Sequence, residues 1–439
     1  MKYTFKGGIH VNEHKNTAGC RVKVFSSPER VIIPMSQHIG APCLCLVKKG
    51  DTVTVGQKIG AVPDGALGAP VHSSVSGTVE KIEKKPDARG VLTEYVTIKN
   101  DFENTKSPDI NSFDKRLSEA SSDEIISIVR EAGIVGMGGA GFPAHVKISS
   151  GIGKASSIII NCAECEPFLT ANYRLMMEKP VDIINGSKIL MKALGIRNVI
   201  IAVEDNKPHA IKKLSALTES ESMIKVVTLK TKYPQGDERR LIYALTGKEL
   251  PSGKLPADVG CVIFNAETAA AVYTAFASGM PSIYRIVTVD GDCVMEPSNV
   301  LAPVGTTISD LVEFCGGLSR PPEKIISGGP MMGAAMWSRD LPVTKTTSGI
   351  LLFSKKVSPE KEESPCIRCG RCVRACPSYL MPFGIVASVK GEKYDEAEGY
   401  GAMSCVECGC CAFGCPAKIP LVQYIKLAKS EIRKKNAKK

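Results

Sequence analysis

The sequence predicts a multidomain protein of the α/β and α+β classes, and three observations support this fold class. Residues 31–99 are rich in glycine, proline and valine and contain short alternating stretches, which is typical of a compact all-β unit. Between residues 157 and 264, strand-like runs alternate with helical stretches, which indicates an α/β unit. A cysteine-rich motif then occurs twice after residue 365. We therefore expect several consecutive domains.

The length and the cysteine usage narrow the class of protein. With 439 residues, the chain is long enough for two to four domains with their own hydrophobic cores. Its 17 cysteines, together with the lack of an apolar N-terminal stretch, indicate a reducing compartment, for which the cytoplasm is the natural choice. No stretch approaches the ~20 consecutive apolar residues that cross a bilayer, so we expect any membrane association to be peripheral.

The charge is strongly basic, with a formal net value of +11 and a basic segment after Gln423. A solvated basic helix end is the commoner meaning of such a tail, and contact with anionic lipid or an acidic partner protein is the alternative. Aromatic residues make up only 5% of the chain and are not interleaved with the basic residues. We therefore expect no nucleic-acid binding.

The repeated cysteine motif has the spacing C-x2-C-x2-C-x3-C-P, which is the bacterial ferredoxin pattern for two [4Fe-4S] clusters. The fourth cysteine of each motif is expected to ligate the other cluster. The predicted ligand sets are therefore Cys366, Cys369, Cys372 and Cys415 for one cluster, and Cys405, Cys408, Cys411 and Cys376 for the other. Zinc sites would leave the two Cys-Pro ends without a role, and disulfides suit small secreted chains. We expect the surplus Cys410 to be a packed thiol.

The N-terminal all-β unit contains two half-motifs, residues 47–60 and 69–79. They resemble the biotinyl/lipoyl-type barrel-sandwich domain, a family that carries its modified lysine on the hairpin between such halves. Here the intervening residues 63–68 contain no lysine. We therefore expect an unmodified structural or docking domain, spanning residues 1–115 with its linker.

A glycine-rich loop follows a predicted helix over residues 123–130, with Ser121 or Ser122 as its N-cap. The loop formally satisfies G-x-G-x-x-G, but a helix precedes it where the dinucleotide-binding fold requires a strand. Backbone N–H groups without side chains can still approach a phosphate or a flat ring, and Lys147 can add a charge. A simple glycine-rich turn is the alternative.

Polar segments follow three of the predicted strands. Residues 161–167 come after the strand at 157–160, residues 233–238 after the strand at 226–229, and residues 265–268 after the strand at 260–264. Open α/β sheets bind ligands at the carboxyl ends of their strands, so we expect these segments to line one crevice.

These segments carry a resemblance. The glycine loop with F-P-x-x-x-K, the N-x-x-E-x-E-P segment and the N-x-E-T segment resemble the FMN- and NADH-binding subunit of respiratory complex I. The resemblance implies a non-covalent FMN site in a domain over residues 116–281, with Glu166 and Phe142 towards the nicotinamide. It implies these FMN contacts: Gly136, Gly138, Gly139, Lys147, Asn161, Glu164, Gly236, Glu238, Asn265 and Thr268. Met137 and Ala163 depart from the complex I pattern, so contacts at those two positions are not carried over. Cys162 and Cys165 form a C-x2-C pair whose flanking carboxylates fit a flavin site better than zinc.

Residues 285–333 resemble the soluble-ligand-binding β-grasp domain, which we place over residues 282–354. Packing against the flavin domain is the expected role of this unit, rather than ligand binding. The polar stretch 355–364 then leads into a helical, ferredoxin-like two-cluster domain, placed over residues 355–439.

The whole chain, including Gly7-Gly8-Ile9-His10 near its start, resembles the C subunit of the ion-translocating Rnf complexes. This implies an NAD(H)-reactive electron-transfer subunit of a ferredoxin:NAD+ oxidoreductase and translocase, with FMN and two [4Fe-4S] clusters. It also implies a peripheral position at the cytoplasmic face of the cell membrane, with other proteins of the complex as partners, ferredoxin as an indirect partner and NADH/NAD+ as substrate. A soluble corrinoid reductase with the same cofactors is one alternative. A non-catalytic electron-wire or scaffold subunit is the other.

Overall fold

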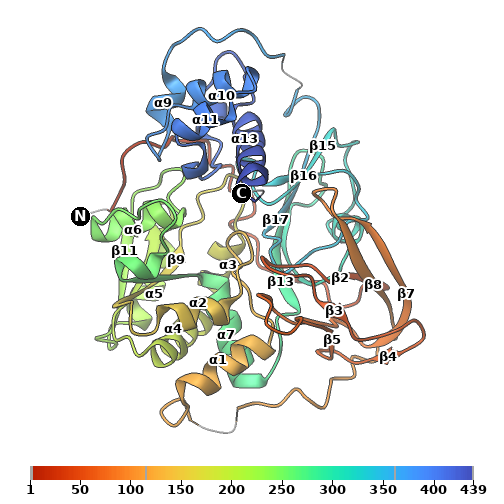
Figure 1. The fold of residues 1–439 in the computed structure, drawn as a ribbon. Helices are drawn as coiled ribbons and strands as arrows, with labels where there is room; N and C mark the ends of the chain where they lie inside the picture. Colours follow the sequence, from red (N-terminus) through yellow and green to blue (C-terminus); the bar gives the residue numbers. More distant parts are fainter. Residues whose placement is uncertain (1–2, 114–115, 360–361, 438–439) are drawn as a thin grey trace.

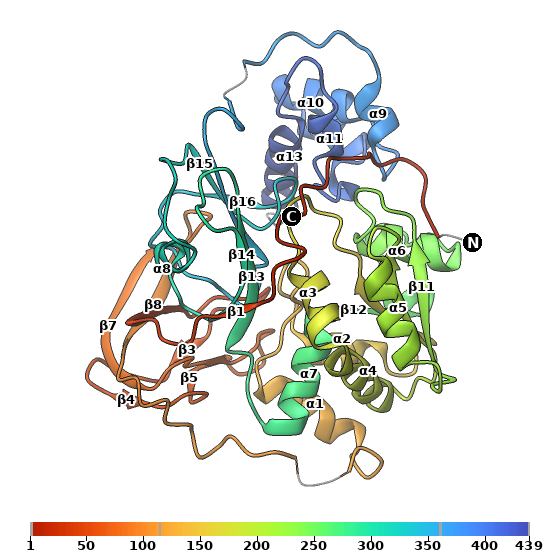
Figure 2. The same ribbon diagram turned by 180° about the vertical axis from the view of Figure 1, so that it is seen from behind.

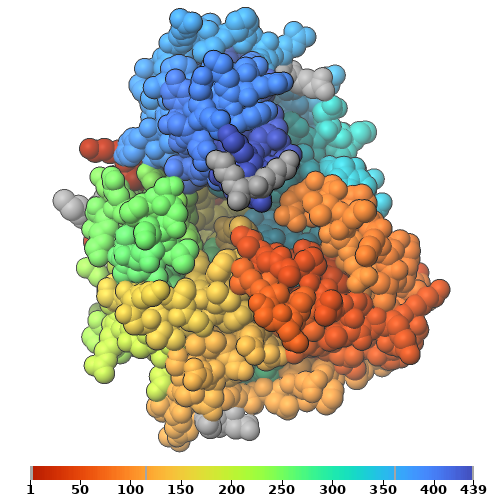
Figure 3. Space-filling model, viewed as in Figure 1, coloured from red at the N-terminus to blue at the C-terminus, as the bar shows by residue number. Residues whose placement is uncertain are grey.

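The computed structural model describes residues 3–113, 116–359 and 362–437. Figure 1 shows the strands of the N-terminal domain beside the strands β13 to β17, and the helices after residue 371 above the α/β domain. In the space-filling view, the N-terminal domain, red to orange, lies against the yellow and green α/β domain (Figure 3). The chain thus forms four structural units, which follow one another along the sequence.

The N-terminal domain consists of two small antiparallel sheets that share one core. One sheet has the order β2-β8-β7-β4 and the other has the order β3-β5-β6. Valine and isoleucine side chains from both sheets form that core, as the alternating pattern predicted. The strands are β2 (Arg30–Pro34), β3 (Leu44–Cys45), β4 (Thr52–Val53), β5 (Lys58–Ala61), β6 (Val71–His72), β7 (Gly77–Pro86) and β8 (Leu92–Asn100).

The α/β domain is built on a parallel four-stranded sheet in the order β11-β10-β9-β12. Its strands are β9 (Ser157–Cys162), β10 (Val199–Glu204), β11 (Ile224–Leu229) and β12 (Cys261–Asn265). Its helices are α1 (Ser122–Glu131), α2 (Ala144–Gly151), α3 (Ala171–Glu178), α4 (Pro180–Leu194), α5 (Pro208–Leu217), α6 (Glu238–Thr246) and α7 (Ala266–Ser278), with a 3-10 turn, η1 (Pro256–Val259). Ser121 caps α1 in a capping box with Glu124, which confirms the predicted helix start.

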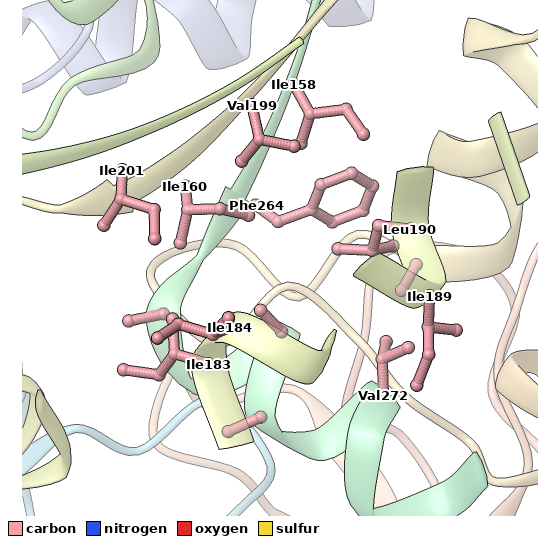
Figure 4. Close-up of a cluster of buried hydrophobic side chains, with 14 of the residues drawn as sticks. Ile158, Ile160, Ile183, Ile184, Ile189, Leu190, Val199, Ile201, Phe264 and Val272 are labelled. Atoms are coloured by element: carbon pink, nitrogen blue, oxygen red, sulfur yellow. The ribbon is translucent and has the colours of Figure 1, made fainter. Parts of the chain in front are cut away.

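The main core of this domain lies between the sheet and the helices α4 and α7. Figure 4 shows side chains of β9, β10 and β12 on one side and those of α4 and α7 on the other. The two helices cross closely at Gly186, where a Cβ atom would lie 1.8 Å from the carbonyl oxygen of Ala269. Because all four strands are parallel, their carboxyl ends lie at the same edge of the sheet.

The third unit has a mixed sheet in the order β1-β14-β13-β17-β15-β16. Its elements are β13 (Tyr284–Asp290), β14 (Ser298–Pro303), α8 (Ile308–Phe314), β15 (Lys324–Ser327), β16 (Ala334–Met336) and β17 (Gly349–Phe353). Thr307 caps α8 in a capping box with Asp310. The N-capped helix between strands agrees with the predicted β-grasp pattern.

The C-terminal unit is helical. It contains α9 (Arg371–Ala375), α10 (Pro382–Lys390), α11 (Tyr394–Gly399), η2 (Ala402–Ser404), α12 (Cys410–Phe413) and α13 (Leu421–Asn436). The basic tail forms most of α13, and one of its lysines is not solvated: Lys429 is buried, pairs with Glu407 and donates to the carbonyl oxygen of Cys405 at 3.0 Å. Within the described ranges, no helix is both long and apolar enough to cross a membrane.

Residues 3–25 form a segment that we call the N-terminal strap, which runs along the other domains before the first strand of the N-terminal sheets. Tyr3 bridges to Leu229 at the edge of the α/β sheet. The strand β1 (Lys23–Val24) extends the third sheet by pairing with β14. Figure 2 shows this segment, in red, running from α9 past α3 to β1. The strap therefore contacts the other domains rather than the core of its own.

The strap needs glycine at positions 7 and 8 because its backbone passes very close to other parts of the chain there. Gly7 and Gly8 have φ angles of +74° and +72°. A Cβ atom would lie 2.8 Å from the carbonyl oxygen of Cys376 at Gly7 and 2.4 Å from that of Tyr233 at Gly8. The Gly8 amide donates to the carbonyl oxygen of Ala375 at 3.0 Å. Glycine alone fits both the backbone angles and the space.

Candidate functional site

The predicted flavin residues gather at the carboxyl edge of the parallel sheet. Asn161, at the end of β9, donates from its amide to the carbonyl oxygen of Gly236 at 2.8 Å and accepts from the Ala163 amide at 3.1 Å. A Cβ atom at Gly236 would lie 3.0 Å from the Ala163 carbonyl oxygen. The loops after β9 and β11 are thus held against each other by one side chain and one glycine.

The glycine-rich loop lies on the same edge, next to the start of α7. Its ends are joined by a bond from the Gly136 amide to the Phe142 carbonyl at 2.8 Å. The Met137 amide donates to the Thr268 hydroxyl at 3.0 Å, and a Cβ atom at Gly138 would lie 2.9 Å from the Asn265 side chain. Thr268 and Asn265, both predicted site residues, therefore support this loop.

The outer part of the loop, at Gly138 and Gly139, lies at the surface, and we call it the cradle. Gly138 and Gly139 are exposed, and a Cβ atom at Gly139 would meet nothing within 4 Å. The half-buried Phe142 closes the loop on the inner side. Backbone groups without side chains can approach a phosphate or a flat ring here, so the residues present fit a bound flavin nucleotide.

A charged pair borders the cradle. The Lys147 ammonium, on α2, lies 2.6 Å from the Glu238 carboxylate and 3.0 Å from the Ile263 carbonyl oxygen. Glu238 is the first residue of α6, which Asp237 caps. The structure thus brings Lys147 and Glu238 together, although 91 residues separate them in the sequence.

Glu164 lies beneath this edge, 6% exposed. Its carboxylate accepts from the amides of Asn172 at 2.8 Å and Tyr173 at 3.2 Å, at the start of α3. Its own amide donates to Glu204, which pairs with Lys207 at 2.9 Å. These two amides at the helix N-terminus hold the Glu164 carboxylate in a fixed position beneath the edge.

Glu166 lies two residues further on and contacts the third unit. One carboxylate oxygen accepts from the Met331 amide and the other from the Met332 amide, both at 3.0 Å. The Tyr233 hydroxyl is 3.2 Å from the second oxygen. Burial raises the pKa of Glu166, against these hydrogen bonds, which lower it. A carboxylate offers about four acceptor positions and the two amides occupy two of them, so at least one remains for a further donor.

Three residues of this region were not predicted. Arg285 of β13, 1% exposed, pairs with Glu267 at 2.8 Å and donates to the Met137 carbonyl oxygen of the glycine loop. Tyr233 reaches the cysteine motifs, and Lys15 reaches the Glu164 loop from the strap. Tyr233 lies within a polar segment that the sequence singled out, whereas Lys15 and Arg285 carry no local signal.

The eight motif cysteines line two cavities. The first, of about 220 Å³, is bordered by Cys366, Cys369, Cys372 and Cys415. The second is bordered by Cys376, Cys405, Cys408, Cys410 and Cys411. Each cavity thus combines three cysteines of one motif with the last cysteine of the other. Nowhere in the described ranges do three cysteine, histidine or acidic side chains converge as a single metal ion requires, whereas a cubane cluster spreads its four thiolates.

The two cavities differ in exposure. Cys366 and Cys369 are exposed, whereas Cys376, Cys408 and Cys411 are buried. The surplus Cys410 is also buried, and its thiol lies 3.9 Å from the Tyr233 carbonyl oxygen. The first cavity therefore faces the surface, and the second faces the α/β domain.

Tyr233 joins the second cavity to the flavin region. Its hydroxyl donates to the carbonyl oxygen of Cys408 at 2.7 Å, and the residue is 1% exposed. The same hydroxyl contacts Glu166. One side chain thus connects the loop after β9 with the second cysteine motif.

Family models match four consecutive parts of the chain. They are the RnfC barrel sandwich hybrid domain over residues 3–103, the Nuo51 FMN-binding domain over residues 129–274, the SLBB domain over residues 286–335 and a 4Fe-4S dicluster domain over residues 365–419. These matches confirm the predicted fold class.

Relatives match over nearly the full length. The C subunit of the Na(+)-translocating ferredoxin:NAD(+) oxidoreductase complex of Acetobacterium woodii is 45% identical over 98% of this chain and 97% of its own. The proton-translocating counterpart of Clostridium ljungdahlii is 45% identical over 99% of this chain and 95% of its own. The C subunit of the ion-translocating oxidoreductase complex of Rhodobacter capsulatus is 40% identical over 100% of this chain and 85% of its own. The chain belongs to this family of Rnf C subunits.

As a member of the Rnf C family, the chain is an electron-transfer subunit of an Rnf-type oxidoreductase complex. Its FMN-binding and dicluster domains make FMN and [4Fe-4S] clusters its cofactors. The predicted family and cofactors are thereby confirmed.

A solved structure shares part of the fold. An NAD+-reducing [NiFe]-hydrogenase aligns with a TM-score of 0.50 and 18% sequence identity, covering 70% of this chain and 63% of that chain. At this identity, the likeness of the Rnf C chain to the hydrogenase concerns the fold alone.

Proposed function

We propose that this chain is the NAD(H)-reactive subunit of a membrane-bound, ion-translocating ferredoxin:NAD+ oxidoreductase. One observation carries the proposal: within a single chain, Tyr233 connects the flavin-type loop after β9 to the second of two four-cysteine cavities. A hydride site and a one-electron relay are thus joined by protein contacts. Ion movement belongs to the complex as a whole.

The flavin site combines a cradle and a charge. Bound FMN would exchange two electrons with a nicotinamide and release them one at a time. Gly138 and Gly139 leave backbone N–H groups free to bind the phosphate, and Lys147, which pairs with Glu238 on α6, would add a positive charge. The surrounding loops are fixed next to one another by hydrogen bonds of Asn161, Gly236, Asn265 and Thr268.

Glu166 is the residue that we assign to the nicotinamide. Its carboxylate is held by two backbone amides and so has a fixed orientation. The acceptor position that remains can bind the carboxamide N–H of the nucleotide. Phe142, half-buried, would contribute its ring to the site, and Glu164, buried, would contribute its carboxyl group.

The cysteines hold two [4Fe-4S] clusters in interlaced sets. Cys366, Cys369, Cys372 and Cys415 bind the surface cluster, and Cys376, Cys405, Cys408 and Cys411 bind the inner one, a division that the two cavities support. The contact of Tyr233 with Cys408 supports a position of the inner cluster on the side of the flavin loop. With both clusters bound, the cysteine sets would provide a one-electron path from the flavin loop to the surface of the C-terminal unit.

The surface cluster is the point of exchange with a partner. Ile367 is 67% exposed beside Cys366, and Arg368, Arg371 and Arg374 are exposed around it. A basic rim with an apolar centre suits an acidic electron carrier, such as an iron–sulfur subunit that receives electrons from ferredoxin. The chain would bind such subunits peripherally at the cytoplasmic face of the membrane.

NADH oxidation with ferricyanide as acceptor tests the proposal on the anaerobically purified holoprotein. We expect turnover that depends on bound FMN. A non-catalytic electron-wire subunit would retain both clusters and oxidise no NADH. A corrinoid reductase would reduce a corrinoid and would not purify with a membrane complex, so isolation of the native assembly from membranes decides that alternative.

A further inference from the structure

We propose that Lys15 of the N-terminal strap is a positioning residue for the loop that carries Glu164 and Glu166, an inference that rests on the proposed function. Its ammonium donates to three backbone carbonyl oxygens of that loop: Glu164 at 2.8 Å, Glu166 at 2.7 Å and Leu169 at 2.7 Å. These bonds join segments 149 to 154 residues apart in the sequence.

The bonding of Lys15 is saturated. An ammonium group has three N–H donors, and all three are used on one short loop. Three carbonyl dipoles that point at one place repel each other unless a cation lies between them. The turn of residues 164–169 is therefore stable only with a cation in this oxygen cage, which the strap supplies from its own side chain.

Lys15 also balances the charge beneath the flavin edge. Glu164 and Glu204 are buried there, and Lys207 pairs with Glu204 at 2.9 Å. Burial lowers the pKa of Lys15, while Glu164 and Glu204 raise it and Lys207 lowers it further. Two carboxylates thus face two ammonium groups. Loss of Lys15 would leave one negative charge in excess next to Glu164.

Other strap residues fix the place of Lys15. The Glu13 carbonyl accepts from the Phe168 amide at 2.9 Å, and the His14 ring stacks on the Phe168 ring with centroids 4.8 Å apart. Phe168 adopts a φ of +69°, a strained angle for a side chain of this size. The Thr17 and Thr170 hydroxyls meet at 2.5 Å. The strap and the loop therefore run together over five residues of the strap, with Lys15 at the centre.

The shape of this turn sets the positions of the Glu164 and Glu166 carboxylates, which have different partners. Glu164 meets the first amides of α3, and Glu166 meets the amides of Met331 and Met332. Both carboxylates reach these donors only if the turn between residue 164 and residue 169 keeps its shape. Lys15, whose three donors are all used on backbone carbonyls, acts through this shape.

Amide hydrogen exchange of the holoprotein tests the inference without an activity measurement. In Lys15→Ala, the amides of Asn172, Tyr173, Met331 and Met332 should exchange ~10-fold faster or more, because their carboxylate acceptors are displaced. Millimolar methylammonium, which carries three N–H donors and fits the space left by the side chain, should restore protection. Tetramethylammonium has no N–H donor and should not.

NADH kinetics per bound FMN supply the second readout. We expect KM for NADH to rise ~10-fold in Lys15→Ala and to fall again with methylammonium. The FMN content should fall by a smaller factor, because Glu164 is displaced while Lys147 and the glycine loop lie on other elements. Lys15→Gln keeps part of the donor capacity, so its KM for NADH should lie between those of the wild type and Lys15→Ala. Lys23→Ala removes an exposed strap lysine paired with Glu296 and should change neither KM nor FMN content.

Unchanged exchange of the four amides in Lys15→Ala would overturn the inference. So would a general loss of protection and of FMN that methylammonium does not reverse, since that outcome means a role in folding alone. If wild-type protein with full FMN oxidises no NADH, the proposed function fails, while the exchange measurement still decides the role of Lys15.

Discussion

The hydroxyl of Tyr233 donates a hydrogen bond to the carbonyl oxygen of Cys408 at 2.7 Å. It also lies 3.2 Å from the carboxylate of Glu166, so one buried group touches both the flavin loop and the second cysteine motif. A tyrosine hydroxyl has a single proton, and the shorter distance assigns it to Cys408. The relative position of the loop after β9 and the second cysteine motif depends on this contact.

Tyr233→Phe should slow electron passage from NADH to the clusters while leaving NADH–ferricyanide turnover near normal. The substitution also removes a buried donor, which should cost ~1–3 kcal/mol of stability. Cluster bleaching after rapid mixing with NADH measures the first effect and anaerobic melting the second. Tyr243→Phe on α6 is the control. Bleaching at the wild-type rate would show that the hydroxyl plays no part in the relay.

Cys376→Ala should damage the inner cluster and spare the surface cluster, because Cys376 borders the cavity of Cys405, Cys408 and Cys411. Paramagnetic resonance and iron content report the loss. Cys410→Ala, which removes the surplus thiol of the same cavity, should keep both clusters. A loss confined to the cluster of the first motif would reject the interlaced arrangement.

Lys147→Met should weaken FMN binding by ~10- to 100-fold, as expected for the loss of a charge-assisted hydrogen bond to the phosphate worth ~1.5–3 kcal/mol. Titration of the apoprotein with FMN, followed by quenching of flavin fluorescence, gives the affinity. Lys154→Met changes an exposed lysine beyond the end of α2 and is the matched control. Equal affinities in the two variants would remove Lys147 from the site.

Glu166→Gln should slow hydride transfer by ~10- to 100-fold, or about 1.4–2.8 kcal/mol of barrier, with FMN content near normal. Glutamine keeps the size but turns one of the two acceptors, which face the amides of Met331 and Met332, into a donor. FMN occupancy is measured alongside NADH–ferricyanide turnover. If activity falls only in proportion to lost flavin, Glu166 serves the packing of the loop and not the nicotinamide.

The burial of the Lys345 ammonium leads us to expect that the stability of the protein depends on pH. Its ammonium, in a residue 1% exposed, donates to the carbonyl oxygens of Pro70 at 2.6 Å and Gly133 at 2.7 Å, and thereby joins three domains. Burial lowers the pKa of Lys345 to about 7 from an ordinary value of 10.5. Between these values the unfolded chain binds more protons than the folded chain, so stability rises with pH.

The measurement compares anaerobic melting of the wild type and Lys345→Met from pH 6 to pH 10. Above pH 7, the free energy of unfolding of the wild type should rise relative to that of the variant, by up to ~1.4 kcal/mol per pH unit. His38, His72 and Cys43 lie nearby, and burial lowers the pKa of both histidines and raises that of the thiol. A constant difference across the range would mean that Lys345 stays charged in the folded protein.

The sequence by itself determined the local and repetitive features of this protein. The cysteine spacing specifies the cluster motifs, since cysteines separated by two and three intervening residues are the ferredoxin pattern for [4Fe-4S] clusters. The alternation of strands and helices predicted the parallel sheet, and polar residues after three strands predicted one functional edge. Asn161, Lys147 and Asn265 were identified in this way because their signals lie within a few residues of strand ends and glycines.

Tertiary structure alone decided which distant residues complete the site. Lys15 lies 149 residues from Glu164, and Met331 lies 165 residues from Glu166. A periodicity reports only which face of its own element a residue occupies, so it cannot identify a partner on another domain. The strap shows this most clearly. Lys15 and His14 lie in no recognisable motif, and their roles arise because close packing brings the strap within bonding distance of the loop at residues 164–169.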